Sequence, residues 1–290
     1  MLKKRILITI ITYLTIIFCQ EKTCAQNLET FKADSLYGFK ESSGEIKIEP
    51  QYQYAREFKN NYAVVAKNNK LGLIDKFNQI AIPFKYEFLK HLQDDKFIFG
   101  FRAKYFGEYH LGVIDTTNTI LIKPIYSKIK LKNNVLETVI QKDSIIGQSS
   151  IGDTRSIRNK RGLRTLDGKQ ILPNEFDYIS WLENGLIVLR KANLKALYNP
   201  NGIKLTDFEY IVIGEFKNGL SKVRKGDKYG FINENGHLSI PTKFEMCYPF
   251  ENGFSRVQLN EKWGIIDKTG NYVFEPKYSF EEMKQWIKTL

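Results

Sequence analysis

Hydrophobic and polar residues alternate in short runs along this chain, and the alternation repeats. In the stretch 262–278, an apolar run at residues 263–266 leads into a polar turn. A second apolar run at 272–274 then leads to Pro276 and Tyr278. Short apolar runs separated by Gly, Asn and Asp are typical of strands joined by tight turns. The stretch therefore predicts a β-hairpin, and six more stretches of the chain follow the same pattern.

One position marks each copy, a small residue inside the first strand, which we call the anchor. The anchors are Gly38, Gly72, Gly112, Gly162, Ala196, Gly230 and Gly264. Successive anchors are 34, 40, 50, 34, 34 and 34 residues apart. A fixed period of this length indicates a solenoid, a propeller or another tandem array. Because the unit contains strand and turn signals, it does not fit helical repeats of the same length.

The turn of each hairpin carries two recurring positions. Six residues after the anchor lies glycine or asparagine, the residues that adopt a positive φ angle at least cost. These residues are Gly44, Asn78, Asn118, Gly168, Gly202, Gly236 and Gly270. Three residues after the anchor, side chains such as Asp75, Asp115 and Asp267 can accept hydrogen bonds from the backbone of the turn. We interpret these aspartates as turn residues.

The second strand of each copy ends near a proline, and an aromatic residue follows. The aromatics are Tyr52, Tyr86, Tyr126, Phe176, Phe208, Phe244 and Tyr278. They lie 14 residues after the anchor in six copies and 12 in the fifth, which lacks the proline and is interpreted as two residues shorter. We expect the aromatics to be buried in a continuous core. A further strand before the anchor makes each unit a three-stranded meander, with a short fourth strand at the aromatic.

Two intervals between anchors are longer than the others and contain insertions. The first, residues 100–110, holds four aromatic residues and predicts an extended hairpin. The second, residues 141–160, is rich in Ser, Gly, Asp and Arg and is interpreted as a loop. Insertions in repeat arrays often gather on the binding face, so these two segments are the best candidates for function. Ordinary variation in loop length is an equally good explanation.

The ends of the chain differ from the repeats. Residues 1–25 have a basic start, an apolar run and Thr23-Cys24-Ala25 before Gln26, which predicts a secretory signal peptide. The alternative is an uncleaved anchor helix, although the apolar run is shorter than a usual span. Cys19 could carry a lipid anchor, but the residue before such a cysteine is normally small and Phe18 is large. We expect the protein to be exported to the periplasm or the outside of the cell.

These boundaries divide the chain into a signal peptide (1–25), an N-terminal lead-in (26–36), seven repeats (37–278) and a capping helix (279–290). Ser279 and Glu282 have the spacing of a capping box, and apolar residues follow at helical spacing. The fold class is all-β with tandem meanders. We favour an open solenoid-like array over a closed seven-bladed propeller, because the chain ends in a helix and not in a strand that closes a ring.

Charge and residue chemistry narrow the functional classes. The formal charge of +12 falls to +9 when residues 1–25 are removed. In an exported protein, this charge argues against nucleic acid and for anionic cell-surface material as a partner. After the signal peptide no apolar run approaches the roughly 18 residues of a membrane-spanning helix. We expect no metal, cofactor or catalytic residue, since His91, His110 and His237 share no ligand spacing and Cys247 is the one thiol left.

The repeat resembles the WG-repeat family of bacterial proteins, whose unit has an aromatic-Gly pair, a turn and a Pro-x-Tyr end. The matching residues are Trp263-Gly264 with Asp267, Gly270, Pro276 and Tyr278; Tyr229-Gly230 with Gly236, Pro241 and Phe244; and Leu71-Gly72 with Asp75, Pro83 and Tyr86. The resemblance implies a β-rich binding or scaffolding module. We therefore expect a noncatalytic module that binds a protein, a peptide or an anionic glycan in the cell envelope. The alternative is an envelope hydrolase with its site in residues 100–110 and 141–160.

Overall fold

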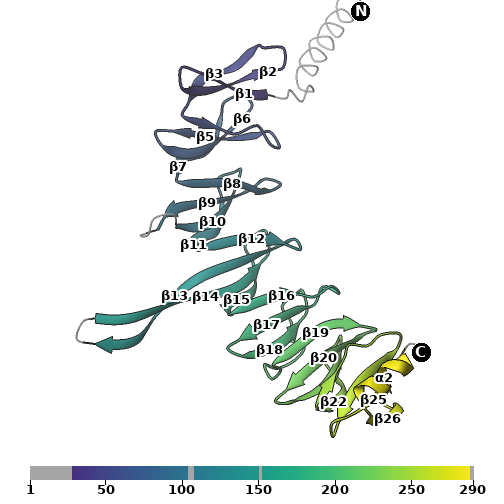
Figure 1. The fold of residues 1–290 in the computed structure, drawn as a ribbon. Coiled ribbons are helices and arrows are strands. Elements are labelled where there is room, and N and C mark those ends of the chain that lie inside the picture. Colours follow the sequence, from purple (N-terminus) through teal and green to yellow (C-terminus); the bar gives the residue numbers. More distant parts are fainter. Residues whose placement is uncertain (1–27, 104–107, 150–151, 288–290) are drawn as a thin grey trace, which may run out of the picture. The chain divides into compact units, whose positions relative to one another are not determined.

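The computed structural model describes residues 28–103, 108–149 and 152–287, with only the backbone for 143–149, 152–156 and 284–287. The predicted signal peptide at 1–25 lies outside these residues. The described chain forms seven separate antiparallel sheets of three or four strands, and none closes into a barrel (Figure 1). The all-β fold with tandem meanders is thus confirmed. The chain divides into two compact units at Pro124 and Ile125.

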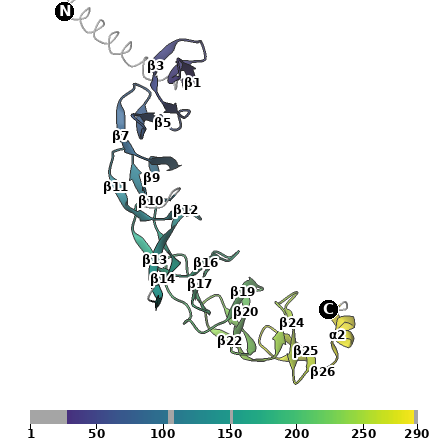
Figure 2. The same ribbon diagram turned by 60° about the vertical axis from the view of Figure 1, so that its left-hand side comes forward.

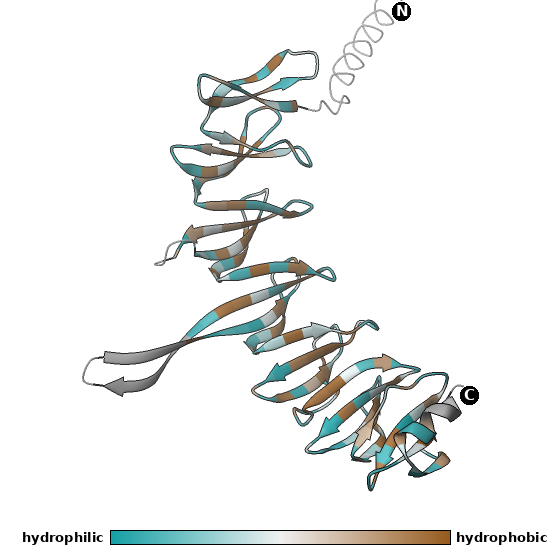
Figure 3. Cartoon of the chain, in the orientation of Figure 1, coloured by the Kyte–Doolittle hydropathy of each residue, from teal (hydrophilic) through white to brown (hydrophobic). Residues whose placement is uncertain are grey.

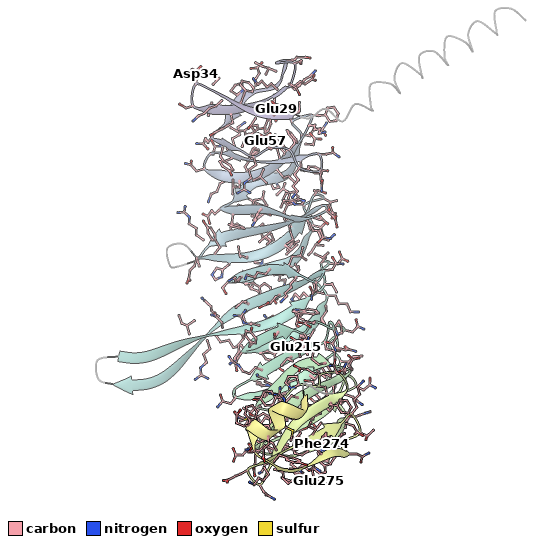
Figure 4. The ribbon with its side chains drawn as sticks, turned by 45° about the vertical axis from the view of Figure 1, so that its right-hand side comes forward. Glu29, Asp34, Glu57, Glu215, Phe274 and Glu275 are labelled. Atoms are coloured by element: carbon pink, nitrogen blue, oxygen red, sulfur yellow. The ribbon has the colours of Figure 1, made fainter. Side chains whose placement is uncertain are left out.

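The first unit contains the first three sheets. The first sheet is β1 (Leu28–Ala33), β2 (Leu36–Glu41) and β3 (Ile46–Tyr52); the second is β4 (Tyr54–Ala55), β5 (Tyr62–Lys67), β6 (Lys70–Asp75) and β7 (Ile80–Tyr86); the third is β8 (Phe88–Gln93), β9 (Lys96–Arg102), β10 (Tyr109–Asp115) and β11 (Ile120–Tyr126). Residues 28–33 of the predicted lead-in thus belong to the first sheet. Glu57 joins this sheet to the second, because it accepts a hydrogen bond from Thr30 Oγ1 at 2.5 Å (Figure 4).

The second unit contains four more sheets and a helix. The fourth sheet is β12 (Lys128–Lys132), β13 (Val135–Ser149), β14 (Gly152–Arg164) and β15 (Gln170–Phe176); the fifth is β16 (Tyr178–Trp181), β17 (Ile187–Lys191) and β18 (Leu194–Tyr198). The sixth is β19 (Val212–Lys217), β20 (Leu220–Lys225), β21 (Lys228–Asn233) and β22 (Leu238–Phe244); the seventh is β23 (Met246–Cys247), β24 (Phe254–Leu259), β25 (Lys262–Asp267) and β26 (Tyr272–Tyr278). Within each unit the sheets follow one another in chain order (Figure 2).

The aromatic residue of each copy marks the step from one sheet to the next. The last strand of the first sheet ends at Tyr52, and β4 begins at Tyr54 in the second sheet. The short fourth strand expected at the aromatic therefore exists, but it belongs to the following sheet. Sequence repeats and sheets are offset by one strand.

The cores lie between consecutive sheets of the same unit. Leu73 and Ile82 of the second sheet pack with Phe97 of the third, and Phe231 of the sixth packs with Val257 of the seventh. Apolar and polar residues accordingly alternate along many strands (Figure 3). The expected burial is confirmed for five of the seven recurring aromatics, since Tyr52, Tyr86, Tyr126, Phe176 and Phe244 are each at most 3% exposed, whereas Phe208 and Tyr278 are half-buried.

The hairpin turns have the predicted geometry. All seven turn positions have positive φ angles, between 63° at Asn78 and 91° at Gly44. The carboxylate of Asp267 accepts hydrogen bonds from the backbone N–H groups of Thr269 and Asn271, at 2.8 and 3.0 Å. Asp75 and Asp115 make the same pair of bonds in their own turns. The side chains of the recurring aspartates therefore stabilise the hairpin turns, as the sequence predicted.

Anchor positions require glycine because two strands approach closely there. The pairing between β21 and β22 shifts register between Tyr229 and Phe231, across Gly230, and again between Phe231 and Ile232. A Cβ atom at this position would lie 2.5 Å from the carbonyl oxygen of Ile240 and 2.8 Å from the Pro241 backbone. Other anchors, such as Gly38 and Gly264, face the same crowding from the following strand. Because glycine has no side chain, the following strand can approach the anchor closely at the register shift.

The interpretation of the fifth copy as two residues shorter is wrong. Lys195, directly before the anchor Ala196, pairs with Tyr210, whereas the equivalent partner in the sixth sheet is Phe244. Tyr210 is 14 residues after Ala196 and only 3% exposed, so it occupies the recurring aromatic position. Phe208 is half-buried and stacks on Phe176 with 6.1 Å between ring centroids. The copy has the standard length, but its last strand is replaced by isolated bridges.

The structure confirms the prediction for the first insertion and contradicts the prediction for the second. Residues 100–110 extend a hairpin as predicted, with Tyr109 paired to Arg102 and His110 to Phe101, although 104–107 lie outside the described residues. The interpretation of 141–160 as a loop is wrong. Strands β13 and β14 continue through it and pair as far as Ser149 and Gly152. A ladder that is already paired at its base gains backbone hydrogen bonds as it extends, whatever the polarity of its side chains.

The C-terminal helix is confirmed as α2 (Phe280–Ile287). Its capping box forms as expected: Ser279 N–H donates to Glu282 Oε2 at 2.7 Å, and Glu282 N–H donates to Ser279 Oγ at 3.3 Å. Met283 is fully buried against Trp263 and Ile265 of the seventh sheet. The helix thus covers apolar residues of the last sheet. In the described part of the chain, no helix has the length and apolar character that a membrane span requires.

Candidate functional site

The second insertion forms a two-stranded arm, which we define as residues 141–149 and 152–160. Beyond Val139, β13 has no pairing with β12, and before Arg161, β14 has none with β15. Among the described residues, each strand of the arm therefore pairs only with the other strand. Figure 1 shows the arm extending from the fourth sheet. The outer backbone N–H and C=O groups of both strands are consequently left without a strand partner.

The first insertion is held by contacts to its own sheet. The N–H of Arg102 donates to Glu87 Oε2 at 2.6 Å, and the ring of Tyr109 lies 5.3 Å from that of Phe88. These contacts explain the segment as part of the third sheet. The described residues of 100–110 are therefore held against their own sheet, and we take the arm as the stronger candidate for a binding element.

A carboxylate directly after the recurring aromatic forms a contact that sequence reasoning missed. Glu87, Asp177 and Glu245 hold this position, and each side chain accepts a hydrogen bond from a backbone N–H at or just after the end of the second strand of the following sheet. A lysine of the preceding sheet also approaches each carboxylate; Lys70 Nζ, for example, lies 2.7 Å from Glu87 Oε1. We call this contact the carboxylate clasp. The recurrence of acidic residues one position after the aromatic was the signal that could have revealed it.

The clasp lowers the pKa of its carboxyl groups. For Glu245, the main cause is the hydrogen bond from the backbone N–H of Glu261, at 2.9 Å. For Glu87 it is the backbone N–H of Arg102, and for Asp177 it is the hydrogen bond from Lys160. These shifts follow from structural contacts that tie one sheet to the next. They do not indicate a catalytic site.

Replacing Glu245 by glutamine is expected to lower the unfolding midpoint at neutral pH, and the difference from the native protein should disappear in acid. A carboxyl whose folded pKa lies below the unfolded value of about 4.3 contributes its full stability above that value. It loses this contribution as the pH falls through the folded pKa. Urea midpoints over a pH series measure the effect. Glu275→Gln is the control, since Glu275 is exposed on β26, and a pH-independent difference for Glu245→Gln would contradict the prediction.

A groove lies between the fifth and sixth sheets, inside the second unit. Its volume is about 300 Å³. The lining residues are Tyr178, Ser180, Leu182, Val188, Arg190, Lys195, Ile213, Gly214 and Glu215. Leu182, Val188 and Ile213 belong to the buried core beneath, so the floor is apolar. Glu215 stands at its edge and accepts a hydrogen bond from the Glu183 N–H at 3.0 Å (Figure 4).

Sequence departures within the fifth copy coincide with the groove. Four residues after the aromatic, four other sheets carry Arg56, Lys90, Lys130 and Tyr248, while the two sheets that form the groove have the small residues Ser180 and Gly214. Directly before the anchor, where Tyr229 and Trp263 stand in the next two copies, the fifth copy has Lys195. The sequence analysis singled out the fifth copy for its alanine anchor and missing proline but did not predict a site there. The deviation itself was the available signal.

The groups considered for chemistry lie apart. His91 Nε2 is 2.9 Å from the carbonyl oxygen of Asp94. The backbone N–H of His237, and not its ring, donates a hydrogen bond to Oδ1 of Asn233. Cys247 is buried, and this burial raises the pKa of its thiol to about 12. Within the part of the chain that the structure describes, no group of three or more His, Cys, Asp or Glu residues could hold a metal ion.

Serial antiparallel sheets, repeated turns and a terminal helix define a tandem β-repeat protein. The chain belongs to the WG containing repeat family, whose model matches residues 37–70, 72–105, 112–134, 197–229, 229–263 and 263–280. These ranges cover more than half of the chain. Residues 135–196, which include the arm and most of the fifth sheet, are not matched, although the fold continues through them. Family and fold are compatible with a repeat-built interaction module.

Solved structures resemble the chain only distantly. A eukaryotic initiation factor is 11% identical with a TM-score of 0.33, over 85% of this chain and 73% of that one. Hsv2 of Kluyvelomyces marxianus is 7% identical with a TM-score of 0.29, over 87% and 98%. A Bacteroides caccae protein of unknown function is 15% identical with a TM-score of 0.22, over 72% and 90%. None of the curated proteins matches this chain in sequence.

Proposed function

We propose that the protein is an exported, noncatalytic interaction module of the cell envelope, and that the arm is its main contact element. The observation that supports this role is that, within the described chain, residues 141–149 pair with 152–160 and with no third strand. An extended segment of a partner can add a strand to such an edge by backbone hydrogen bonds. A free edge also favours aggregation, so natural proteins rarely leave a long one without a use or a safeguard.

The composition of the arm supports a specific partner over self-association. Residues 141–160 include four basic side chains (Lys142, Arg155, Arg158 and Lys160) and two acidic ones (Asp143 and Asp153). Net positive charge disfavours pairing between two copies of the arm and favours an acidic segment. The register shift between Ile145 and Gly147 is a further feature that limits uncontrolled edge pairing. In the envelope, the partner would be a protein, a peptide or an anionic glycan.

The experiment replaces residues 141–159 by Asn-Gly, a type I′ turn, so that the hairpin closes at the pair Ile140–Lys160. This change keeps Lys160 and its 2.5 Å ion pair with Asp177. The intact protein beginning at Gln26 is used to isolate partners from an envelope extract. Each partner is then purified and its dissociation constant is measured against both proteins. We expect the arm-replaced protein to bind at least about tenfold more weakly.

Circular dichroism spectra and urea midpoints serve as the folding control for the arm-replaced protein. A variant with Arg155→Gln and Arg158→Gln separates charge from backbone pairing, since it keeps the strands. Equal affinity of the intact and arm-replaced proteins for every purified partner would rule out the arm as the contact element. Failure of the intact protein to hold any purified partner would overturn the interaction role itself.

A further inference from the structure

The groove of the fifth sheet carries two cations on one face. Arg190 of β17 and Lys195 of β18 are directly opposite each other in the strand register, and both line the groove. Like charges that face each other across a strand pair destabilise a sheet. In the equivalent pairs of the next two sheets, Arg224 faces Tyr229 and Gln258 faces Trp263. The fifth sheet is thus the one of these three that places two positive charges together.

The acidic groups near these cations are already engaged elsewhere. Asp177 is bound by Lys160 and by the Ala192 N–H, and Glu215 accepts the Glu183 N–H. Among the described residues, no carboxylate lies within ion-pair distance of Arg190 or Lys195. The positive charge of Arg190 nevertheless contributes to the lowered pKa of Asp177. The groove therefore has two cations whose charge no side chain of the described chain pairs.

Other walls of the groove define the shape of a ligand. The guanidinium of Arg190 lies over the ring of Tyr178, 5.7 Å from its centroid, and this ring is 50% exposed. Stacking holds the guanidinium in place while leaving its N–H groups able to donate. The small Ser180 leaves space above the apolar floor. A ligand that fits combines a carboxylate with a short apolar stem.

We propose that this groove binds an acidic side chain of an extended peptide, with Arg190 and Lys195 as the carboxylate ligands. Strand β16, which carries Tyr178 and Ser180, is one of the two edge strands of its sheet, since the order is β16, β17, β18. An edge strand beside a side-chain pocket is the arrangement that recognises peptides by strand addition. The backbone of the peptide would pair with β16, and alternate side chains would enter the groove. A glycan offers no equivalent backbone, which favours the peptide.

The test measures binding of the mature protein to a labelled short peptide of alternating glutamate and valine by fluorescence anisotropy. An otherwise identical glutamine–valine peptide and an oligoglucuronate are the comparison probes. We expect the glutamate peptide to bind the native protein at least about tenfold more tightly than either comparison probe, because charged hydrogen bonds are lost with glutamine. The arm-replaced protein should bind it unchanged, which separates this site from the proposed role of the arm.

Two variants locate the binding to the groove. Arg190→Gln with Lys195→Gln should weaken binding about tenfold or more. The matched control, Lys191→Gln with Lys204→Gln, removes the same charge from outside the groove and should change affinity less than about twofold. Ser180→Tyr should fill the groove and abolish binding; the equivalent residue of the seventh sheet is Tyr248, so the fold accommodates this side chain.

Four outcomes would overturn the proposal. Equal binding of the glutamine peptide would remove the role of the carboxylate. An equal loss in the matched control would reduce the binding to general charge attraction. Binding of oligoglucuronate without the peptide would assign the groove to a glycan, and no binding of any probe would show that the groove is not a carboxylate site. Circular dichroism confirms that each variant is folded.

Discussion

Tyr210→Ala is expected to destabilise the second unit by about 3–4 kcal/mol, the usual cost of removing a fully buried ring. Tyr210 is 3% exposed and packs with Leu197, Ile213 and Val223 between the fifth and sixth sheets. Burial also raises the pKa of its hydroxyl group to about 12. All three tryptophans of the chain, Trp181 among them, lie in the second unit, so urea unfolding followed by tryptophan fluorescence reports on this part of the molecule.

Phe208→Ala is the matched control for this prediction, because sequence spacing alone puts Phe208 in the same role. Its ring is half-buried and contacts Phe176 and Tyr198 at the margin of the core. The expected loss is about half of that for Tyr210→Ala, since the cost follows the apolar area removed from the core. If Phe208→Ala were the more damaging change, the assignment of Tyr210 to the recurring aromatic position would be wrong.

Gly230→Ala is expected to cost about 2–3 kcal/mol, the range for forcing an extra group into a packed site. The added Cβ atom would collide with the carbonyl oxygen of Ile240 at 2.5 Å, and the contact atom is backbone, which cannot rotate away. To relieve the clash, β22 must move away from β21. The same urea titration gives the loss of stability, and circular dichroism shows whether the sheet still forms.

The natural alanine of the fifth copy provides the control for the glycine anchor. Ala196 is fully buried, but the strand that crowds the other anchors is absent from its sheet, which ends at β18. Ala196→Gly should therefore cost no more than about 1 kcal/mol, the entropic penalty of glycine. A large loss from Ala196→Gly together with a small loss from Gly230→Ala would contradict the role assigned to the anchor.

Hairpin turns and recurring cores could be predicted because local chemistry determines them. Asn78 and its six equivalents adopt positive φ angles since the turn admits few other residues, and Asp75 binds its own turn. The same reasoning failed for 141–160. Its Ser, Gly and Asp residues resemble a loop, but strand pairing depends on the backbone and on the ladder that the arm continues. The isoleucines at 145, 146 and 157 were the available sign of strand propensity.

The groove could not be predicted from residue types, because it depends on which side chains are missing. Ser180 leaves space only in relation to the sheets on either side of it, and Arg190, whose charge reaches Asp177, has no ion pair there because Asp177 is occupied by Lys160. Phe208 misled the sequence interpretation for a related reason. Two aromatics lie close together in the chain, and the pairing of Lys195 with Tyr210 decides between them. Tertiary contacts therefore decide which of the two aromatics occupies the recurring position.

The offset between repeats and sheets determines where the chain can be cut and rejoined. One residue links Phe244 at the end of β22 to Met246 at the start of β23, and Tyr210 stands in the same way before β19. Removal of residues 211–244 would excise the whole sixth sheet and place Glu245 directly after Tyr210. An acidic residue would then follow the recurring aromatic, as it follows Phe244 in the native chain. A cut at the anchors would instead join halves of two different sheets. Breakpoints directly after the aromatic therefore add or remove one complete sheet, and the sheet is the unit by which such a chain can be lengthened without forming a hybrid sheet.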